Sequence, residues 1–221
     1  KICKKCDILY HLAGANRPKN DIKFKKDNII YTKKILKALS HNKKKPSIIY
    51  TSTSRYDENT KYAISKKKVE EIIIRYSKKN LSKYYILRLP NVFGKWAKPF
   101  YNSFLTTIFY QVTRNKTVEI SQKDKKINLI YVDDLIENLK KFINFKKKKS
   151  LIKNLKRDSY KIGFLYNKIL NICKNKKKNI VLNTATSLDR KLYATMLTYM
   201  PKKNIFQKLD SNDDHRGSFV E

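Results

Sequence analysis

The chain has 221 residues, of which 41% are hydrophobic, enough for the core of one substantial domain or of one domain with a small appendage. Its formal net charge is +34, and the excess is nearly all lysine, spread over every segment. Nucleic-acid readers rely on arginine for bidentate contacts and carry recognisable motifs, so this composition argues against a specific nucleic-acid reader, and the lack of a long apolar run argues against a membrane-spanning protein.

The first part of the chain alternates short apolar segments with longer amphipathic ones. Strands are predicted at 7–13, 47–51 and 84–89, and helices at 21–41 and 62–79, with breaks at Gly14, Pro18, Pro46 and Pro90. Strands that alternate with long helices indicate βαβ units. We therefore predict an α/β fold with a doubly wound parallel sheet of the Rossmann type.

The pattern changes in the second part of the chain. Helices are predicted at 101–114, 160–173 and 188–200, and short strands at 117–120 and 127–132. Asp133 and Asp134 are interpreted as the cap of a helix that runs to Phe145, in preference to a pair of catalytic carboxylates.

The three cysteines predict no metal site. Cys3 and Cys6 have the spacing of half a zinc site, but no second pair follows, and Cys173 stands alone. Cys6 also leads into a predicted strand, where it fits as a small hydrophobic residue. Because no disulfide framework is visible either, we expect a reducing, cytoplasmic environment.

A tyrosine and a lysine, Tyr62 and Lys66, lie four residues apart in a predicted helix that follows Thr53. At that spacing both side chains can face one bound molecule. A free tyrosine has a pKa near 10, and a neighbouring ammonium lowers it, so the phenol can protonate the alkoxide that forms when a hydride reaches a carbonyl. Thr53, at the carboxyl end of its strand, can hydrogen-bond the same oxygen. In a chain rich in Tyr and Lys, the same spacing also arises by chance.

Longer motifs stand in order along the chain: HLAGANRP at His11–Pro18, YAISK at Tyr62–Lys66, LRLPNVFGKW at Leu87–Trp96 and YVDDL at Tyr131–Leu135. In this order they resemble the extended short-chain dehydrogenases/reductases. Three further segments, Asn91–Ser103, Leu192–Thr195 and Asp214–Phe219, resemble the branch of capsular-polysaccharide enzymes that form UDP-N-acetyl-6-deoxy-L-talosamine on the route to UDP-N-acetyl-L-fucosamine. The resemblance covers nearly the whole chain.

The resemblance implies a reductase that uses NADPH, with NADH as the alternative, to reduce the C4 ketone of a UDP-4-hexulose for capsular polysaccharide or O-antigen precursors. Its implied partners are a UDP-amino-sugar and a second copy of the chain in a homodimer, without specific nucleic acid or membrane. It assigns catalysis to Thr53, Tyr62 and Lys66, cofactor binding to Ala13, Gly14, Tyr62, Lys66 and Pro90, and substrate binding to Asn91 and Arg114.

By the same resemblance the chain has three parts. Residues 1–99 correspond to the C-terminal part of an NAD(P)-binding Rossmann-like domain. Residues 100–209 correspond to a small mixed substrate-binding region with some sheet-completing elements, and 210–221 to a junction toward an absent cupin domain. The charge run Lys146–Lys149 is interpreted as a solvated link, and the polar, turn-rich stretch Asp210–Phe219 as the junction.

Plainer interpretations remain for several of these positions. Gly14 and Pro90 also fit as strand ends, and Asn91 fits as a turn residue. His11 lies in a predicted strand and is interpreted as a hydrogen-bonded core residue in preference to a catalyst.

The four glycines of the chain form no glycine-rich loop, which in this fold holds the pyrophosphate of the cofactor at a helix N-terminus. We therefore expect an N-terminally truncated fragment that lacks about 40 residues of the first βαβ unit and is inactive by itself. The alternatives are a catalytically degenerate protein that binds a nucleotide sugar or another subunit, and a basic nucleic-acid binder.

Overall fold

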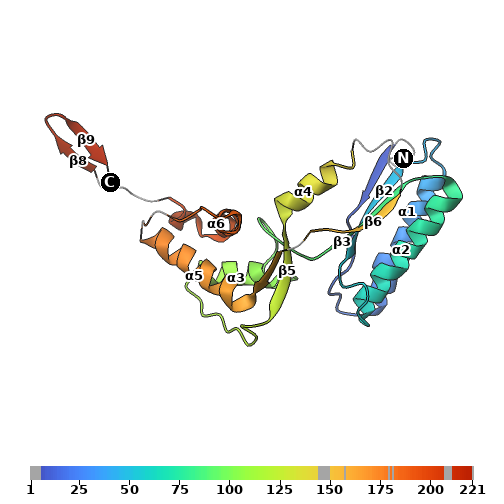
Figure 1. Ribbon diagram of the computed structural model, residues 1–221, viewed down its shortest axis with the longest axis horizontal. Helices are drawn as coiled ribbons and strands as arrows, with labels where there is room; N and C mark the ends of the chain where they lie inside the picture. The colour runs from blue at the N-terminus through green and yellow to red at the C-terminus, as the bar shows by residue number, and fades with distance from the viewer. Residues whose placement is uncertain are drawn as a thin grey trace. The chain divides into compact units, whose positions relative to one another are not determined.

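The computed structural model describes residues 6–143, 150–156, 158–178, 180, 182–206 and 211–220 (Figure 1). The chain divides into two compact units, unit 1 with residues 1–93 and 127–159 and unit 2 with residues 94–126 and 160–221. Cys3 and the charge run Lys146–Lys149 lie outside the described residues. Within the described residues, no helix has both the length and the apolar character needed to cross a membrane.

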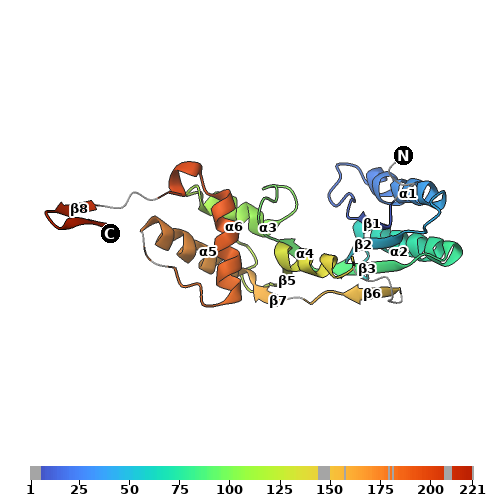
Figure 2. The same ribbon diagram turned by 90° about the horizontal axis from the view of Figure 1, so that it is seen from above.

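Unit 1 contains a parallel four-stranded sheet in the order β1-β2-β3-β6, which Figure 2 shows in succession. The strands are β1 (Ile8–His11), β2 (Ser47–Thr53), β3 (Tyr84–Leu89) and β6 (Leu151–Asn154). The parallel pairing places Thr53 opposite Leu89, so β2 and β3 end together at one edge of the sheet. The predicted α/β fold with a parallel sheet is therefore confirmed, although β6 was not predicted.

Both faces of this sheet are covered, as expected for a doubly wound fold. One face packs Ile48, Tyr50 and Ile86 against α1 (Tyr31–Ser40) and α2 (Lys61–Asn80). The opposite face packs the alternate residues Ile49, Tyr85 and Leu87. They lie against Leu135 of α4 (Val132–Lys140), Phe142 after this helix and Leu155 after β6. Strands buried on both faces read as continuous apolar runs, which is why β2 and β3 were predictable.

The helix predicted at 21–41 is formed by two consecutive segments. The first, Phe24–Ile30, is π-helical, and α1 continues from it without a break. π-helical turns are rare and often occur at functional sites. The segment buries one polar residue, Asn28, on the side that faces the rest of unit 1.

A second, three-stranded sheet has the order β4-β5-β7, with β4 (Asn91–Phe93), β5 (Lys126–Tyr131) and β7 (Asp158–Lys161). The strand predicted at 127–132 is present as β5, but the one predicted at 117–120 is wrong, because that segment has no strand conformation. Asp133 and Asp134 are not caps either: the N-cap of α4 is Tyr131. Both carboxylates lie in the first turn, where they interact favourably with the positive end of the helix dipole.

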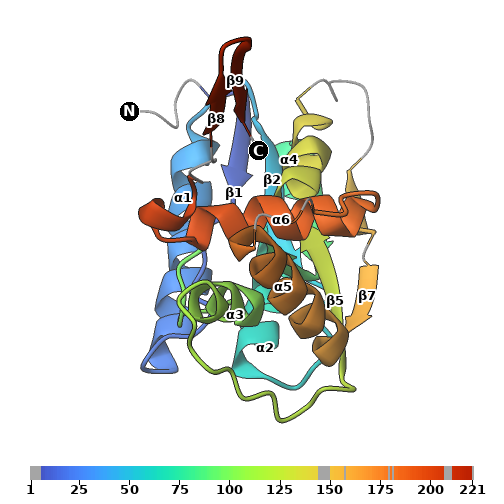
Figure 3. The ribbon, with the colours of Figure 1, turned by 90° about the vertical axis from the view of Figure 1, so that its left-hand side faces the viewer.

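Unit 2 is built around three helices that pack on one another, α3 (Phe104–Val112), α5 (Ile162–Lys177) and α6 (Ser187–Tyr199), and Figure 3 shows α6 crossing α5. Ser103 and Thr186 cap α3 and α6 with their side-chain oxygens. The polar stretch near the C-terminus forms an antiparallel hairpin of β8 (Ser211–Asp214) and β9 (Gly217–Val220).

Candidate functional site

Helix α2 carries the predicted tyrosine and lysine. It begins after Thr60, whose hydroxyl accepts a hydrogen bond of 3.2 Å from the backbone N–H of Ala63. This cap fixes the first turn, which contains Tyr62, and Lys66 follows one turn later on the same face. That face is buried, so the helix directs Lys66 toward the sheet instead of toward solvent.

The Lys66 side chain is 5% exposed, and its Nζ donates a hydrogen bond of 2.7 Å to the carbonyl oxygen of Thr51. The same Nζ lies 4.3 Å from the centre of the Tyr50 ring. Burial lowers the pKa of the Lys66 ammonium to about 8, while the Glu70 carboxylate acts in the opposite direction. Lys66 is therefore protonated at neutral pH. Its deprotonation nevertheless costs much less free energy than that of a surface lysine.

The Tyr62 phenol is half-buried, with its ring centre 6.2 Å from that of Phe24. Burial raises its pKa above the usual value of 10, and the positive charge of Arg55 acts in the opposite direction. The sequence had suggested that the Lys66 ammonium would lower this pKa. In the structure the opposing charge is Arg55, and burial outweighs it.

Thr53 is the last residue of β2 and is buried at the carboxyl end of the sheet. Its Oγ1 accepts a hydrogen bond of 3.2 Å from the backbone N–H of Arg55. A hydroxyl has one proton to donate, and here the oxygen acts as an acceptor, so the O–H stays available for a bound oxygen atom. The sheet thus brings Thr53 to the same end of the fold as the first turns of α2.

Ala13 and Gly14 follow β1 and are both exposed. A Cβ added to Gly14 would lie 3.1 Å from Asn28 Oδ1 and 3.6 Å from Lys66 Nζ. The backbone of Gly14 therefore lies open beside the Lys66 ammonium, in a space that a side chain would fill. This cradle fits the ribose and nicotinamide end of a dinucleotide, for which an ammonium and exposed backbone groups are suitable partners.

Asn28 was not predicted as a site residue. Its side chain makes both hydrogen bonds to the backbone of Ala15, with Ala15 N to Oδ1 at 2.7 Å and Nδ2 to Ala15 O at 3.1 Å, and Nδ2 also donates to Ser65 Oγ at 2.9 Å. It thereby joins the loop after β1 to α2. The only sequence signal is an asparagine at a core-facing position of a predicted helix.

His11 lies in the core of unit 1, as interpreted from sequence. Its Nε2 is 2.8 Å from Thr32 Oγ1, and that hydroxyl donates to the carbonyl oxygen of Asn28 at 2.6 Å. Because the hydroxyl proton is used there, His11 Nε2–H must be the donor to Thr32. Burial, followed by the nearby charge of Lys66, lowers the pKa of His11 to about 4 and keeps the imidazole neutral.

Pro90 and Asn91 follow β3 directly, next to the edge where Thr53 pairs with Leu89. Pro90 is buried, and the exposed Asn91 donates from Nδ2 to the carbonyl oxygen of Asn128 at 3.1 Å. Both therefore lie at the carboxyl end of the sheet in unit 1, together with the residues described above.

Arg114 belongs to unit 2, whereas the other predicted site residues belong to unit 1. Its Nη1 donates to the carbonyl oxygens of Tyr110 and Tyr199 at 3.2 and 2.8 Å and to Thr113 Oγ1 at 3.3 Å. The guanidinium also lies 3.7 Å from the centre of the Tyr110 ring. These contacts join the C-terminal ends of α3 and α6.

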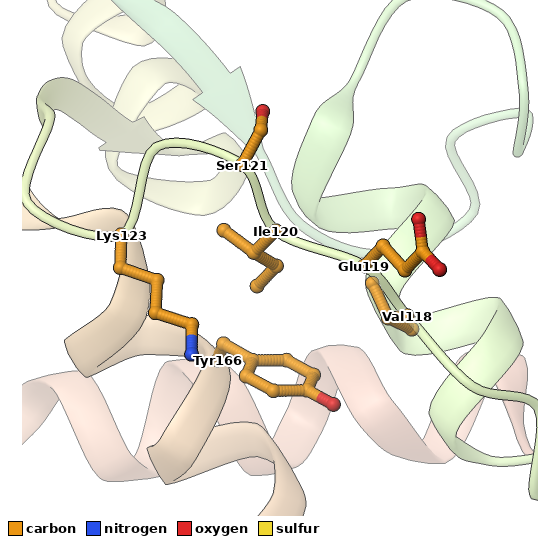
Figure 4. Close-up of a pocket in the computed structure, with 6 residues that line it drawn as sticks. All are labelled: Val118, Glu119, Ile120, Ser121, Lys123 and Tyr166. Carbon is orange, nitrogen blue, oxygen red and sulfur yellow. The ribbon is translucent and has the colours of Figure 1, made fainter.

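Unit 2 also contains an open cavity of about 660 Å³. The segment predicted as a strand at 117–120 forms much of its wall, and Figure 4 shows Ile120, Lys123 and Tyr166 directed toward one another around it. Its lining residues are Val118, Glu119, Ile120, Ser121, Lys123 and Tyr166. Among the residues that the structure describes, no cluster of His, Cys, Asp and Glu side chains fits a metal ion.

Known proteins resemble the chain over most of its length. A model of the NAD dependent epimerase/dehydratase family matches residues 1–163. A curated relative from Pseudomonas aeruginosa, UDP-2-acetamido-2,6-beta-L-arabino-hexul-4-ose reductase, is 28% identical over 222 residues, which cover 100% of this chain and 60% of the relative. The chain therefore spans about 60% of the length of this relative.

Solved structures also resemble the chain over most of its length. The capsular polysaccharide assembling protein CapF of Staphylococcus aureus matches with a TM-score of 0.84 and 28% identity, over 99% of this chain and 59% of that chain. The UDP-glucuronic acid 4-epimerase of Bacillus cereus, in complex with NAD, matches with a TM-score of 0.74 and 20% identity, over 93% of this chain and 77% of that chain. The second likeness shows the fold alone.

Proposed function

Because the chain belongs to the NAD dependent epimerase/dehydratase family, we propose that it carries the catalytic residues of a nicotinamide-dependent reductase. The family membership confirms the resemblance to extended short-chain dehydrogenases/reductases that the motifs predicted. The observation that carries the proposal is the buried Lys66 ammonium, one turn after Tyr62 and beside the exposed backbone of Gly14. The proposed substrate is the C4 ketone of a UDP-4-hexulose, which the name of the Pseudomonas aeruginosa relative supports.

The roles proposed for the three catalytic residues are those that the family resemblance implies, and the hydrogen bond of Thr53 supports one of them. Thr53 donates its free O–H to the carbonyl oxygen of the sugar, since its Oγ1 already accepts from Arg55 N–H. Tyr62 transfers its phenolic proton to the same oxygen as negative charge develops there. Lys66 lies one turn after Tyr62 on the same helix face, and its buried positive charge is proposed to favour the resulting phenolate.

NADPH is the proposed cofactor, with NADH as the alternative, and when bound it supplies the hydride. Ala13 and Gly14 would line the groove that holds it, and Lys66 would exchange its bond to the Thr51 carbonyl for a ribose hydroxyl. Pro90 would border the nicotinamide. The buried Asn28 supports this groove because it fixes the loop that contains Gly14 to the helix that contains Lys66.

The resemblance leads us to propose Asn91 and Arg114 as residues that contact the substrate. Arg114 would have to exchange part of its bonding to Tyr110 and Tyr199 for phosphate oxygens. A UDP-amino-sugar, a homodimer, a cytoplasmic location and a role in precursors of UDP-N-acetyl-L-fucosamine complete the proposal.

The test uses the full-length protein that contains this chain, with a UDP-4-hexulose and NADPH, and measures cofactor oxidation. Tyr62→Phe is expected to lower kcat by about a hundredfold or more, because it removes the proton donor. Tyr76→Phe, on the same helix, is the matched control and is expected to match the unsubstituted protein. Tight binding of the UDP-sugar without any NADPH or NADH oxidation would contradict the proposal and favour a catalytically degenerate binding protein.

A further inference from the structure

A buried ion pair links α2 to the sheet in unit 1. The Glu70 side chain is 5% exposed and that of Arg88 on β3 is 15% exposed. Arg88 Nε donates to Glu70 Oε1 at 3.1 Å and Arg88 Nη2 donates to Glu70 Oε2 at 2.7 Å. The pair is therefore bidentate, which fixes the plane of the guanidinium as well as its position.

The guanidinium of Arg88 has a second partner. Its Cζ lies 3.3 Å from the centre of the Tyr56 ring, so the two planar groups stack. Tyr56 belongs to the loop of residues 54–60, which connects β2 to α2. The ion pair therefore holds this loop against the sheet.

The same loop also acts on two of the proposed catalytic residues, Thr53 and Tyr62. Arg55, the neighbour of Tyr56, donates its backbone N–H to Thr53 Oγ1, and its charge acts on the Tyr62 phenol. A movement of Tyr56 would therefore change the orientation of the Thr53 hydroxyl and the field at Tyr62 together.

We propose that Glu70, Arg88 and Tyr56 are positioning residues for the proposed reduction, which hold the loop 54–60 so that Thr53 and Tyr62 address one substrate oxygen. The inference rests on the proposed function. A purely stabilising role accounts less well for these contacts, because a buried ion pair contributes little net stability compared with apolar residues of the same volume. An apolar pair in its place would also lack the planar surface on which Tyr56 stacks.

The charge of Glu70 also acts on Lys66. Glu70 follows Lys66 by one turn and raises its pKa against the effect of burial. Removal of this charge lowers the pKa of Lys66, so the loss of activity on the alkaline side begins at a lower pH. Among the described residues, His11 on β1, Tyr50 on β2 and Tyr62 on α2 are further titratable groups near Lys66.

The experiment compares variants of the full-length protein by amide hydrogen exchange of residues 54–60 without ligands, and by kcat and its pH profile. Tyr56→Leu and Arg88→Lys are expected to speed exchange in the loop and to lower kcat about ten- to hundredfold, with a smaller effect on KM. Tyr56→Phe keeps the stacked ring and is expected to stay within about threefold of the unsubstituted protein. Glu70→Gln is expected to shift the alkaline limb to lower pH.

The matched control is Glu71→Gln, because the ion pairs of Glu71 with Lys68 and Arg75 on the same helix are exposed. It is expected to change neither loop exchange nor the pH profile. Unchanged loop exchange and kcat in folded Tyr56→Leu and Arg88→Lys would overturn the inference, as would a loss of thermal stability alone. An inactive unsubstituted protein would overturn the proposed function instead, and loop exchange would still decide whether Glu70, Arg88 and Tyr56 hold the loop.

Discussion

Lys66 Nζ donates a hydrogen bond of 2.7 Å to the carbonyl oxygen of Thr51, two residues before the end of β2. This bond ties an ionisable group on α2 to the strand that carries Thr53. Since the bond is made by a side chain to the backbone, the position of the ammonium depends on the course of the strand and not on the identity of the Thr51 side chain.

Replacement of Lys66 is expected to separate activity from stability. A buried lysine whose folded pKa is about 8 binds fewer protons than the unfolded chain between about pH 8 and pH 10.5, so the free energy of unfolding rises with pH in that window. Lys66→Met is expected to abolish this rise, to increase the free energy of unfolding at neutral pH by on the order of 1–3 kcal/mol, and to lower kcat about a hundredfold or more.

Urea unfolding at several pH values and steady-state kinetics check this expectation. The exposed Lys67 is the control, because Lys67→Met changes the charge by the same amount without a buried site. A Lys66→Met variant that is less stable at every pH would contradict the assignment of a destabilising buried charge.

His11 predicts an acid-side loss of stability. Its folded pKa is about 4, below the ordinary value of 6.5, so the unfolded state binds more protons between these values. The free energy of unfolding is therefore expected to fall by on the order of 2 kcal/mol as the pH drops from about 6.5 to about 4. His11→Gln, which keeps a donor for Thr32, is expected to flatten this part of the curve. An equally steep curve in the variant would show that other groups cause the loss.

Substitution of Gly14 is expected to affect the cofactor more than the sugar. A Cβ at Gly14 would lie within 3.1 Å of Asn28 Oδ1 and close to Lys66 Nζ, so it fills the space beside the ammonium. In the full-length protein, Gly14→Ala is expected to raise the KM for NADPH about tenfold while kcat at saturation falls less. Gly14→Val is expected to act in the same direction and more strongly. Unchanged cofactor affinity in both variants would place the cofactor elsewhere.

The ion pair of Glu70 and Arg88 is expected to give strong coupling in a double-mutant cycle. Arg88→Met leaves a buried carboxylate without its partner and is expected to cost about 3–5 kcal/mol in free energy of unfolding. The double variant Glu70→Leu with Arg88→Met is expected to recover a large part of that loss. The exposed pair of Glu71 and Arg75 serves as the comparison, for which about 0.5 kcal/mol is expected. Additive losses in the buried pair would contradict this account.

The central strands and α2 could be predicted from sequence because their signals are local. Strands β2 and β3 are short runs of Ile, Tyr and Leu buried on both faces, and α2 has a threonine cap and a buried stripe. Thr53 ends β2, and Tyr62 and Lys66 lie one turn apart in α2, so the elements that carry them were predicted correctly.

The parts that were missed depend on distant partners. Strands β6 and β7 carry lysine, asparagine and aspartate, and only their pairing in the sheets makes them strands. The segment 117–120 has the alternating apolar pattern of a strand but forms none, because these residues line a cavity. Asn28 and the pair of Glu70 and Arg88 involve contacts across the fold, which no local pattern in one sequence reveals.

The two-sided burial of the sheet has a consequence for folding. Where one face of a strand is polar, a slip of one residue exposes apolar side chains to water and is therefore strongly unfavourable. Strands β2 and β3 are apolar on both faces, so this penalty is weaker for them. A slip of β3 by one residue would instead turn Arg88 to the other face of the sheet. Glu70 would then remain in the core without a counterion. Glu70 and Arg88, which are proposed to position the catalytic residues, therefore also disfavour a strand pairing that is shifted by one residue.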